Sequence, residues 1–176
     1  LTIQAFATIC NGHSVRQSSA PGNEDLPHLI LVGEGPEEEH LRALAKAENV
    51  GSLVHFMGRR NDVREILSES DLLLLSSDAE ACPWAIIESV SVGIPCVSTD
   101  AGAACELIED GVSGYVVKRG SAEELAAGIS KLIDNVERRR SMGDESHCRW
   151  KSMFTRELVV TKHCRLYRSL AEKEVD

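Results

Sequence analysis

Two glutamates, Glu80 and Glu88, follow the apolar run 72–75 with seven residues between them. A loop is expected to carry Glu80, and a helix that starts at Trp84 is expected to carry Glu88. The backbone N–H groups near Trp84 and Ala85 would form the N-terminus of that helix, which suits a phosphate. Carboxylates accept hydrogen bonds from hydroxyl groups and repel phosphate. The segment therefore predicts an anion site flanked by groups that bind sugar hydroxyls.

Apolar runs and helix-start signals alternate along the chain, and this alternation must position the loop. Short apolar runs predict strands at 28–32, 53–57, 72–75, 95–99 and 115–117. Helices are expected at 1–10, 36–50, 84–92 and 103–109. Two more are expected to start after the caps Asn61 and Asp62 and after the cap Ser121. After Asn135 the chain is expected to be helical, with a last helix at 155–174. The stretch 12–27, rich in Ser, Gly, Asn and Pro, is typical of a loop.

The strands are too apolar to show an inner and an outer face, which predicts a parallel sheet covered by helices on both sides. We expect an α/β fold, a Rossmann-like doubly wound parallel sheet flanked by helices, with a C-terminal helical extension. Residues 1–152 are expected to form the domain, and 153–176 a C-terminal helix that packs back on it. Ligands of such sheets bind at the carboxyl ends of the strands. The candidate loops start at Gly33, Gly58, Ser76, Asp100 and Lys118.

Composition and charge narrow the classes of function. The 176 residues include 28 acidic and 19 basic side chains, and this net charge of −9 argues against nucleic acid as a partner. Residues 136–176 carry 10 basic and 7 acidic side chains; a solvated helical face is the first interpretation, and a weak membrane-surface or phosphate contact is the alternative. Six scattered cysteines indicate free thiols in a reducing compartment. With no apolar run of bilayer length and no signal peptide, a cytoplasmic location is expected, with peripheral contact at the inner membrane face as the alternative.

Six stretches, in order, resemble the nucleotide-sugar half of the retaining family-4 glycosyltransferases of GT-B fold. Glu80 and Glu88 are followed by the run Gly-Ile-Pro-Cys-Val at 93–97. The remaining matches are Gly102, Glu106, Gly111 and Gly114, the run Val-Gly-Glu-Gly-Pro at 32–36, the run Val-His-Phe-Met-Gly-Arg at 54–59, and Phe154 with Leu166 and Tyr167. The resemblance covers nearly the whole chain.

The resemblance implies a role for each matching residue. Glu80 would face the donor sugar as the catalytic residue, holding its hydroxyls and stabilising the oxocarbenium-like charge of the transition state. Glu88 would bind the ribose hydroxyls, and the amides of Trp84 and Ala85 the diphosphate. The segments at Gly33 and at 58–64, with Gly58, Arg60 and Arg64, would lie beside the base and ribose. The donor would be a nucleoside-diphosphate sugar, with UDP or GDP, and no metal or other cofactor is expected.

The chain departs from the family pattern at its start. The Arg and Lys that neutralise the leaving diphosphate in the family lie in a first strand directly before the helix with which this chain begins. That strand is expected to be missing here, with the natural N-terminus upstream of Leu1. The amino-terminal domain that would bind a glycan or lipid acceptor has no counterpart either. We therefore expect this chain alone to transfer no sugar and to bind nucleotide weakly.

Structural interpretations compete with these roles. Glu88 would otherwise be a surface carboxylate, and Gly33 with Gly35 only a tight turn. Arg59, Arg60 and Arg64 would otherwise pair with Glu65 or Glu69 on a solvated helix face. For the Trp84 side chain, packing is favoured over stacking on a ligand. Three function classes remain open: the donor-binding domain of a glycosyltransferase, a non-catalytic nucleotide-sugar-binding module, and a sugar-nucleotide epimerase or phosphorylase-like enzyme.

Overall fold

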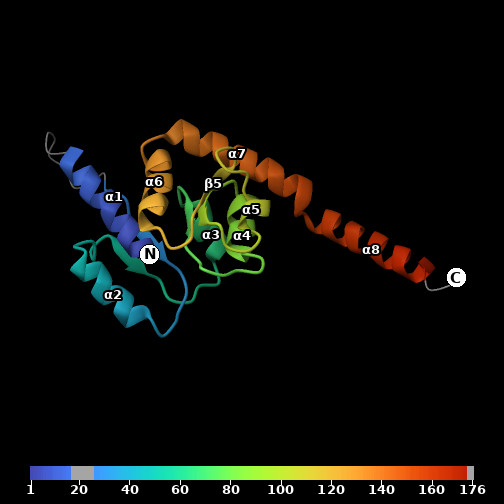
Figure 1. Cartoon of the computed structure of the whole chain (residues 1–176), viewed down its shortest axis with the longest axis horizontal. Helices are drawn as coiled ribbons and strands as arrows, with labels where there is room; N and C mark the ends of the chain where they lie inside the picture. Colours follow the sequence, from blue (N-terminus) through green and yellow to red (C-terminus); the bar gives the residue numbers. More distant parts are fainter. Residues whose placement is uncertain (17–25, 174–176) are drawn as a thin grey trace.

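The computed structural model describes residues 1–16 and 26–173. Its short strands are β1 (Leu29–Leu31), β2 (Val54–Phe56), β3 (Leu73–Leu75), β4 (Cys96–Thr99) and β5 (Gly114–Val117). The helices are α1 (Thr2–Arg16), α2 (Glu38–Ala47), α3 (Val63–Ser68), α4 (Trp84–Ser91), α5 (Ala104–Leu107), α6 (Ala122–Ile133), α7 (Val136–Met153) and α8 (Arg156–Lys173). Helices and strands alternate as far as α6, which confirms the predicted α/β class (Figure 1).

The strand pairs of the described residues are all parallel. They form a two-stranded sheet, β1–β2, and a three-stranded sheet, β3–β4–β5. Leu29 pairs with Val54 in the first sheet, and Cys96 pairs with Gly114 in the second. Among the described residues, the strands therefore form two separate parallel ladders.

Helices cover both faces of the three-stranded sheet. On one face, residues of α1 and α6 pack against Val97 of β4, together with Met142 of α7. On the other face, residues of α4 and α5 pack against Cys96 of β4, with Trp150 and Phe154 at its margin. Burial raises the pKa of the Cys96 thiol, which has no exposed surface.

Helix α1 contacts both sheets. Ile3, Phe6 and Cys10 belong to a core cluster with β1, β2 and α2, whereas Ala5 and Ile9 belong to the cluster of β4 and α6. These positions alternate at helical spacing, so two faces of one helix bury against two different sheets. The helix therefore joins the two halves of the domain.

Side-chain caps fix the starts of two long helices. The Ser121 side chain accepts a hydrogen bond from the Glu124 N–H at the start of α6, as predicted. The Asn135 side chain accepts one from the Arg138 N–H at the start of α7. Asp62 occupies the N-cap position of α3, but its side chain makes no capping bond because it pairs with Arg60.

The first helix is longer than predicted. It continues through Gly12 to Arg16, although residues 12–27 were expected to form a loop. One glycine costs a helix about 1 kcal/mol, which is too little to end a helix that packs against two core clusters. The rest of the expected loop, at 17–25, lies outside the described residues.

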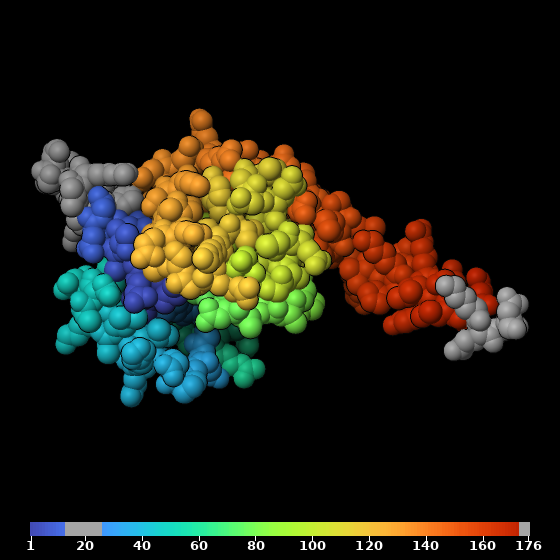
Figure 2. All heavy atoms as spheres, in the orientation of Figure 1, coloured from blue at the N-terminus to red at the C-terminus, as the bar shows by residue number. Residues whose placement is uncertain are grey.

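The expected packing of the C-terminal helix on the domain is wrong. Figure 2 shows α8 projecting from the body of the protein. Leu158 is half-buried, and every described side chain beyond it is exposed. Trp150 and Phe154 at the end of α7 pack against the nearby core cluster of α4 and α5, in the place where α8 was expected to pack. The exposed apolar residues of α8 include Val159, Val160, Leu166, Tyr167 and Leu170. Among the described helices, none is both long and apolar enough to cross a bilayer.

Removing the Phe6 side chain tests the role of α1. Phe6 is 4% exposed, so Phe6→Ala should lower the free energy of unfolding by about 3–5 kcal/mol, from lost burial and the cavity left behind. Gln4→Ala, on the exposed side of the same helix, should change it by less than about 0.5 kcal/mol. Urea denaturation measures both. Equal effects of the two variants would contradict the joining role.

Candidate functional site

The loops after the parallel strands lie at one edge of the domain, because parallel strands end on the same side. The longest connection among them runs from Ser76 to Pro83, between β3 and α4, and carries Glu80. Glu80 is half-buried, and its Oε1 accepts a hydrogen bond from Ser77 Oγ at 2.8 Å. The carboxylate is therefore held at the start of its own loop.

Neighbouring loops fix the backbone of the Glu80 loop. Thr99, fully buried at the end of β4, donates through Oγ1 to the Ser77 carbonyl at 2.6 Å. Gly102, in the loop after β4, has a φ of +54° and lies directly against the Glu80 backbone. A methyl group at this position would overlap the Glu80 carbonyl oxygen, so only glycine fits here.

The N-terminus of α4 offers backbone N–H groups to an anion. Pro83 occupies the N-cap position with an extended backbone, and no side chain caps the helix. The N–H groups of Trp84 and Ala85 donate to no acceptor among the described residues, as is usual for the first turn of a helix. Such a terminus favours phosphate. The packing interpretation of Trp84 is wrong, because its side chain is 71% exposed.

Glu88 lies one turn after Trp84, on the same side of α4. Its side chain is exposed and makes no hydrogen bond with a described residue. A carboxylate in this position can accept bonds from a ligand held at the start of the helix. The sequence thus placed the two glutamates correctly, one on the loop and one on the helix.

Gly33 and Gly58 lie together, as their place after two paired strands requires. The Gly33 N–H donates to the Gly58 carbonyl at 2.8 Å, and both residues have a positive φ, of +135° and +61°. This contact joins the loops after β1 and β2 at the same edge as Glu80.

The two predicted arginines differ in their surroundings. Arg60 donates through Nε to Asp62 Oδ1 at 2.8 Å, and this bond holds the pKa of the Asp62 carboxyl below its usual range. The expected pairing with Glu65 or Glu69 is therefore wrong for Arg60. Arg64 is exposed and forms no ion pair with a described residue, so its charge is available to a ligand.

Four residues that shape the site were not predicted: Ser77, Thr99, Asp100 and Arg119. The sequence identifies Asp100 and Lys118 only as the first residues of strand-end loops. The position of those loops at one edge was the available signal, since it places their side chains within reach of the Glu80 loop.

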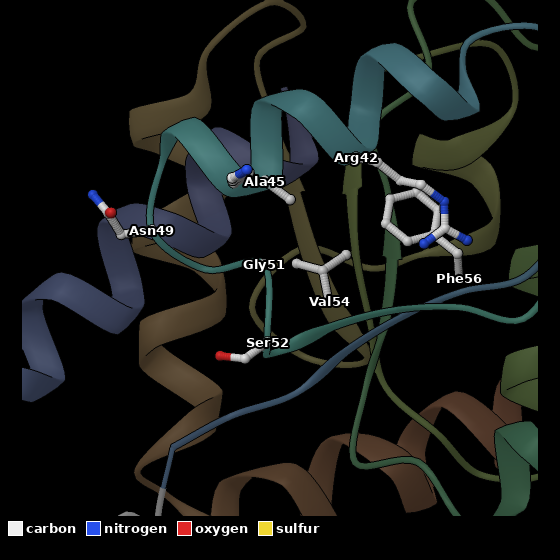
Figure 3. A pocket seen from close by; sticks show the side chains of 8 residues that line it. Arg42, Ala45, Asn49, Gly51, Ser52, Val54 and Phe56 are labelled. Carbon is white, nitrogen blue, oxygen red and sulfur yellow. The ribbon is translucent and has the colours of Figure 1, made fainter.

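A separate pocket lies between α2 and β2 (Figure 3). Its lining includes Arg42, which lies over the Phe56 ring with its guanidinium carbon 4.2 Å from the ring centroid. Gly51 and Ser52, also in the lining, precede β2. The pocket therefore extends to the amino end of the strand, away from the loop edge that carries Glu80.

Comparisons with known proteins show which family the chain resembles. Residues 2–147 match the family model described as glycosyl transferases group 1. The chain is 32% identical to the N-acetyl-alpha-D-glucosaminyl L-malate synthase of Bacillus anthracis over 139 residues, 79% of this chain and 36% of the synthase. It is 30% identical to the lipopolysaccharide core biosynthesis glycosyltransferase LpsE of Rhizobium meliloti over 142 residues, 81% of this chain and 42% of LpsE.

A solved structure extends the likeness to three dimensions. Anabaena HepE in complex with UDP is 25% identical and superposes with a TM-score of 0.79, over 97% of this chain and 44% of HepE. HepE in complex with UDP-glucose superposes with a TM-score of 0.78. The chain thus spans less than half the length of each of these relatives.

A methyl group at Gly102 should disturb the Glu80 loop. Gly102→Ala combines a positive φ with overlap of the Glu80 carbonyl, and should lower the free energy of unfolding by about 2–5 kcal/mol. Gly120→Ala is the matched control: its φ is +77°, but no atom lies within 4 Å of the added methyl, so about 1–2 kcal/mol is expected. Thermal unfolding compares them. An equal loss in both variants would show that the contact with Glu80 carries no constraint.

Proposed function

The chain belongs to the glycosyl transferases group 1 family, and from this membership we propose that it forms the donor-binding half of a glycosyltransferase. The donor is a nucleoside-diphosphate sugar, and the sugar passes to a glycan or lipid acceptor bound by an amino-terminal domain. One observation carries the proposal: the chain superposes over 97% of its length on a structure that holds UDP. The loop edge of this chain carries a free helix N-terminus and two glutamates. Transfer would occur in the cytoplasm, including the inner membrane face for a lipid acceptor.

The geometry supports a division of roles at the site. The free N–H groups of Trp84 and Ala85 would bind the diphosphate, since the partial positive charge of a helix N-terminus favours anions. Glu88, on the same side of α4, would accept hydrogen bonds from the ribose hydroxyls. The joined loops at Gly33 and Gly58, with Arg60 and Arg64 beyond them, would lie beside the base and ribose.

Glu80 would act on the donor sugar. Its Oε1 is held by Ser77, which leaves Oε2 to accept hydrogen bonds from sugar hydroxyls. A fixed carboxylate also stabilises positive charge that develops on the sugar ring as the bond to the diphosphate breaks. We propose that the reaction retains the anomeric configuration and needs no divalent cation. The departing diphosphate would be neutralised by the amides of α4.

Titration calorimetry of the purified chain with UDP, GDP and their sugars tests the assignment. The chain should bind one of these nucleotides, and Glu88→Ala should raise the Kd roughly ten- to hundredfold, the loss expected for a charge-assisted hydrogen bond. Glu145→Ala removes an exposed helical glutamate of α7 and should leave the Kd unchanged. A well-folded chain that bound no nucleotide would contradict the proposal and favour an interaction module.

Removal of divalent cations tests the proposed metal independence. Addition of EDTA should change the nucleotide Kd by less than about twofold, because backbone amides rather than a metal ion would neutralise the phosphates. The same titration with added Mg²⁺ serves as the control. Tighter binding with Mg²⁺ by more than about tenfold would overturn this part of the proposal.

A further inference from the structure

Residues from the ends of two neighbouring strands, β4 and β5, contact the backbone that carries Glu80. The Thr99 hydroxyl holds the Ser77 carbonyl from the end of β4, and Gly102 lies against the Glu80 backbone. A third contact comes from β5, because Arg119 donates through Nη1 to the Asp78 carbonyl at 3.2 Å. The loop is therefore held at three points within four residues, each time by a residue distant in sequence.

Arg119 bonds two loops at the same time. Its Nε and its backbone N–H both donate to Asp100 Oδ1 at 3.0 Å, while Nη1 reaches Asp78. The planar guanidinium suits this arrangement, since its donors point in fixed directions that a lysine ammonium lacks. Arg119 thus links the loops after β3, β4 and β5.

We propose that Arg119 is a positioning residue that holds the Glu80 loop in the geometry needed for the donor sugar. The inference rests on the proposed function of Glu80. Asp100 keeps the guanidinium turned toward the loop and offsets its charge, so Arg119 acts through the Asp78 carbonyl rather than on the diphosphate. Both side chains of this ion pair are about half exposed, at 52% and 42%, so its removal should loosen the loop without unfolding the domain.

Relaxation of ¹⁵N amides at 78–82, measured without ligand, tests the mechanical part. The wild-type loop should show order parameters of about 0.85, and Arg119→Gln should lower them below about 0.6. Arg119→Lys should lower the order parameters equally, because a single ammonium group cannot reproduce the fixed donor directions of the guanidinium. An unchanged loop in Arg119→Gln, or a mobile loop in the wild type, would overturn the inference.

Arg139 provides a matched control at the opposite edge of the sheet. Its guanidinium likewise bonds one carboxylate, Asp71, and two backbone carbonyls, those of Leu132 and Ile133. Asp71 precedes β3, so these bonds lie at the amino ends of the strands. Arg139→Gln should therefore leave the order parameters at 78–82 unchanged even if it lowers the unfolding temperature. Loosening by both variants would indicate a general loss of stability.

Calorimetry with UDP and with UDP-glucose tests the functional part. If Arg119 positions Glu80, Arg119→Gln should leave the Kd of UDP within about twofold and weaken UDP-glucose by about tenfold, the effect of losing one charge-assisted hydrogen bond. Equal weakening of both ligands, restored by Arg119→Lys, would show a direct charge effect on the diphosphate and overturn the positioning role. Absence of binding to wild type would instead contradict the proposed function, while the relaxation data would still decide whether Arg119 holds the loop.

Discussion

Burial of α1 between two sheets is the constraint on which the site depends. The β1–β2 and β3–β4–β5 ladders share no strand pairing, so their relative position follows from side-chain packing. Phe6 and Cys10 lie in one core cluster, and Ala5 and Ile9 in the other. Leu74 of β3 packs against both. Because this helix sets how the sheets meet, it also sets where the Gly33–Gly58 contact lies relative to Glu80.

Within that frame, the loop edge is ordered by polar contacts between loops rather than by apolar packing. The contacts join the segments at 77–80, at 99–102 and at Arg119, which the chain separates by about 20 to 40 residues. Buried Thr99 anchors these contacts to β4. The contacts of Arg119 lie farther from the core and are about half exposed. A site arranged in this way can fix a carboxylate firmly while its outer parts adjust to a ligand.

Local patterns were sufficient to predict the elements and the edge at which the site lies. The apolar runs gave the strands to within about two residues, and Ser121 was identified as a cap from its position before a periodic run. Local patterns do not predict contacts between residues that are distant in sequence. The Arg60–Asp62 pair, the exposed Trp84 and the Arg119 link depend on how loops fold against one another, which no local period encodes. The projection of α8 was not predicted because its apolar residues indicate burial, whereas in the structure they are exposed.

The charges at the loop edge bear on how an acidic protein would bind the proposed diphosphate. The net charge is −9, and Glu80 and Glu88 add negative charge beside the proposed phosphate position. Two of the nearby arginines are offset by carboxylates, Arg60 by Asp62 and Arg119 by Asp100. Arg64 keeps an unpaired charge among the described residues, and at the start of α4 itself the proposed attraction would come from oriented N–H groups, whose field is strong only within a few ångströms. Such short range would separate the proposed tasks: the backbone amides of α4 would bind the phosphates, and Glu80 and Glu88 would remain free to bind hydroxyl groups.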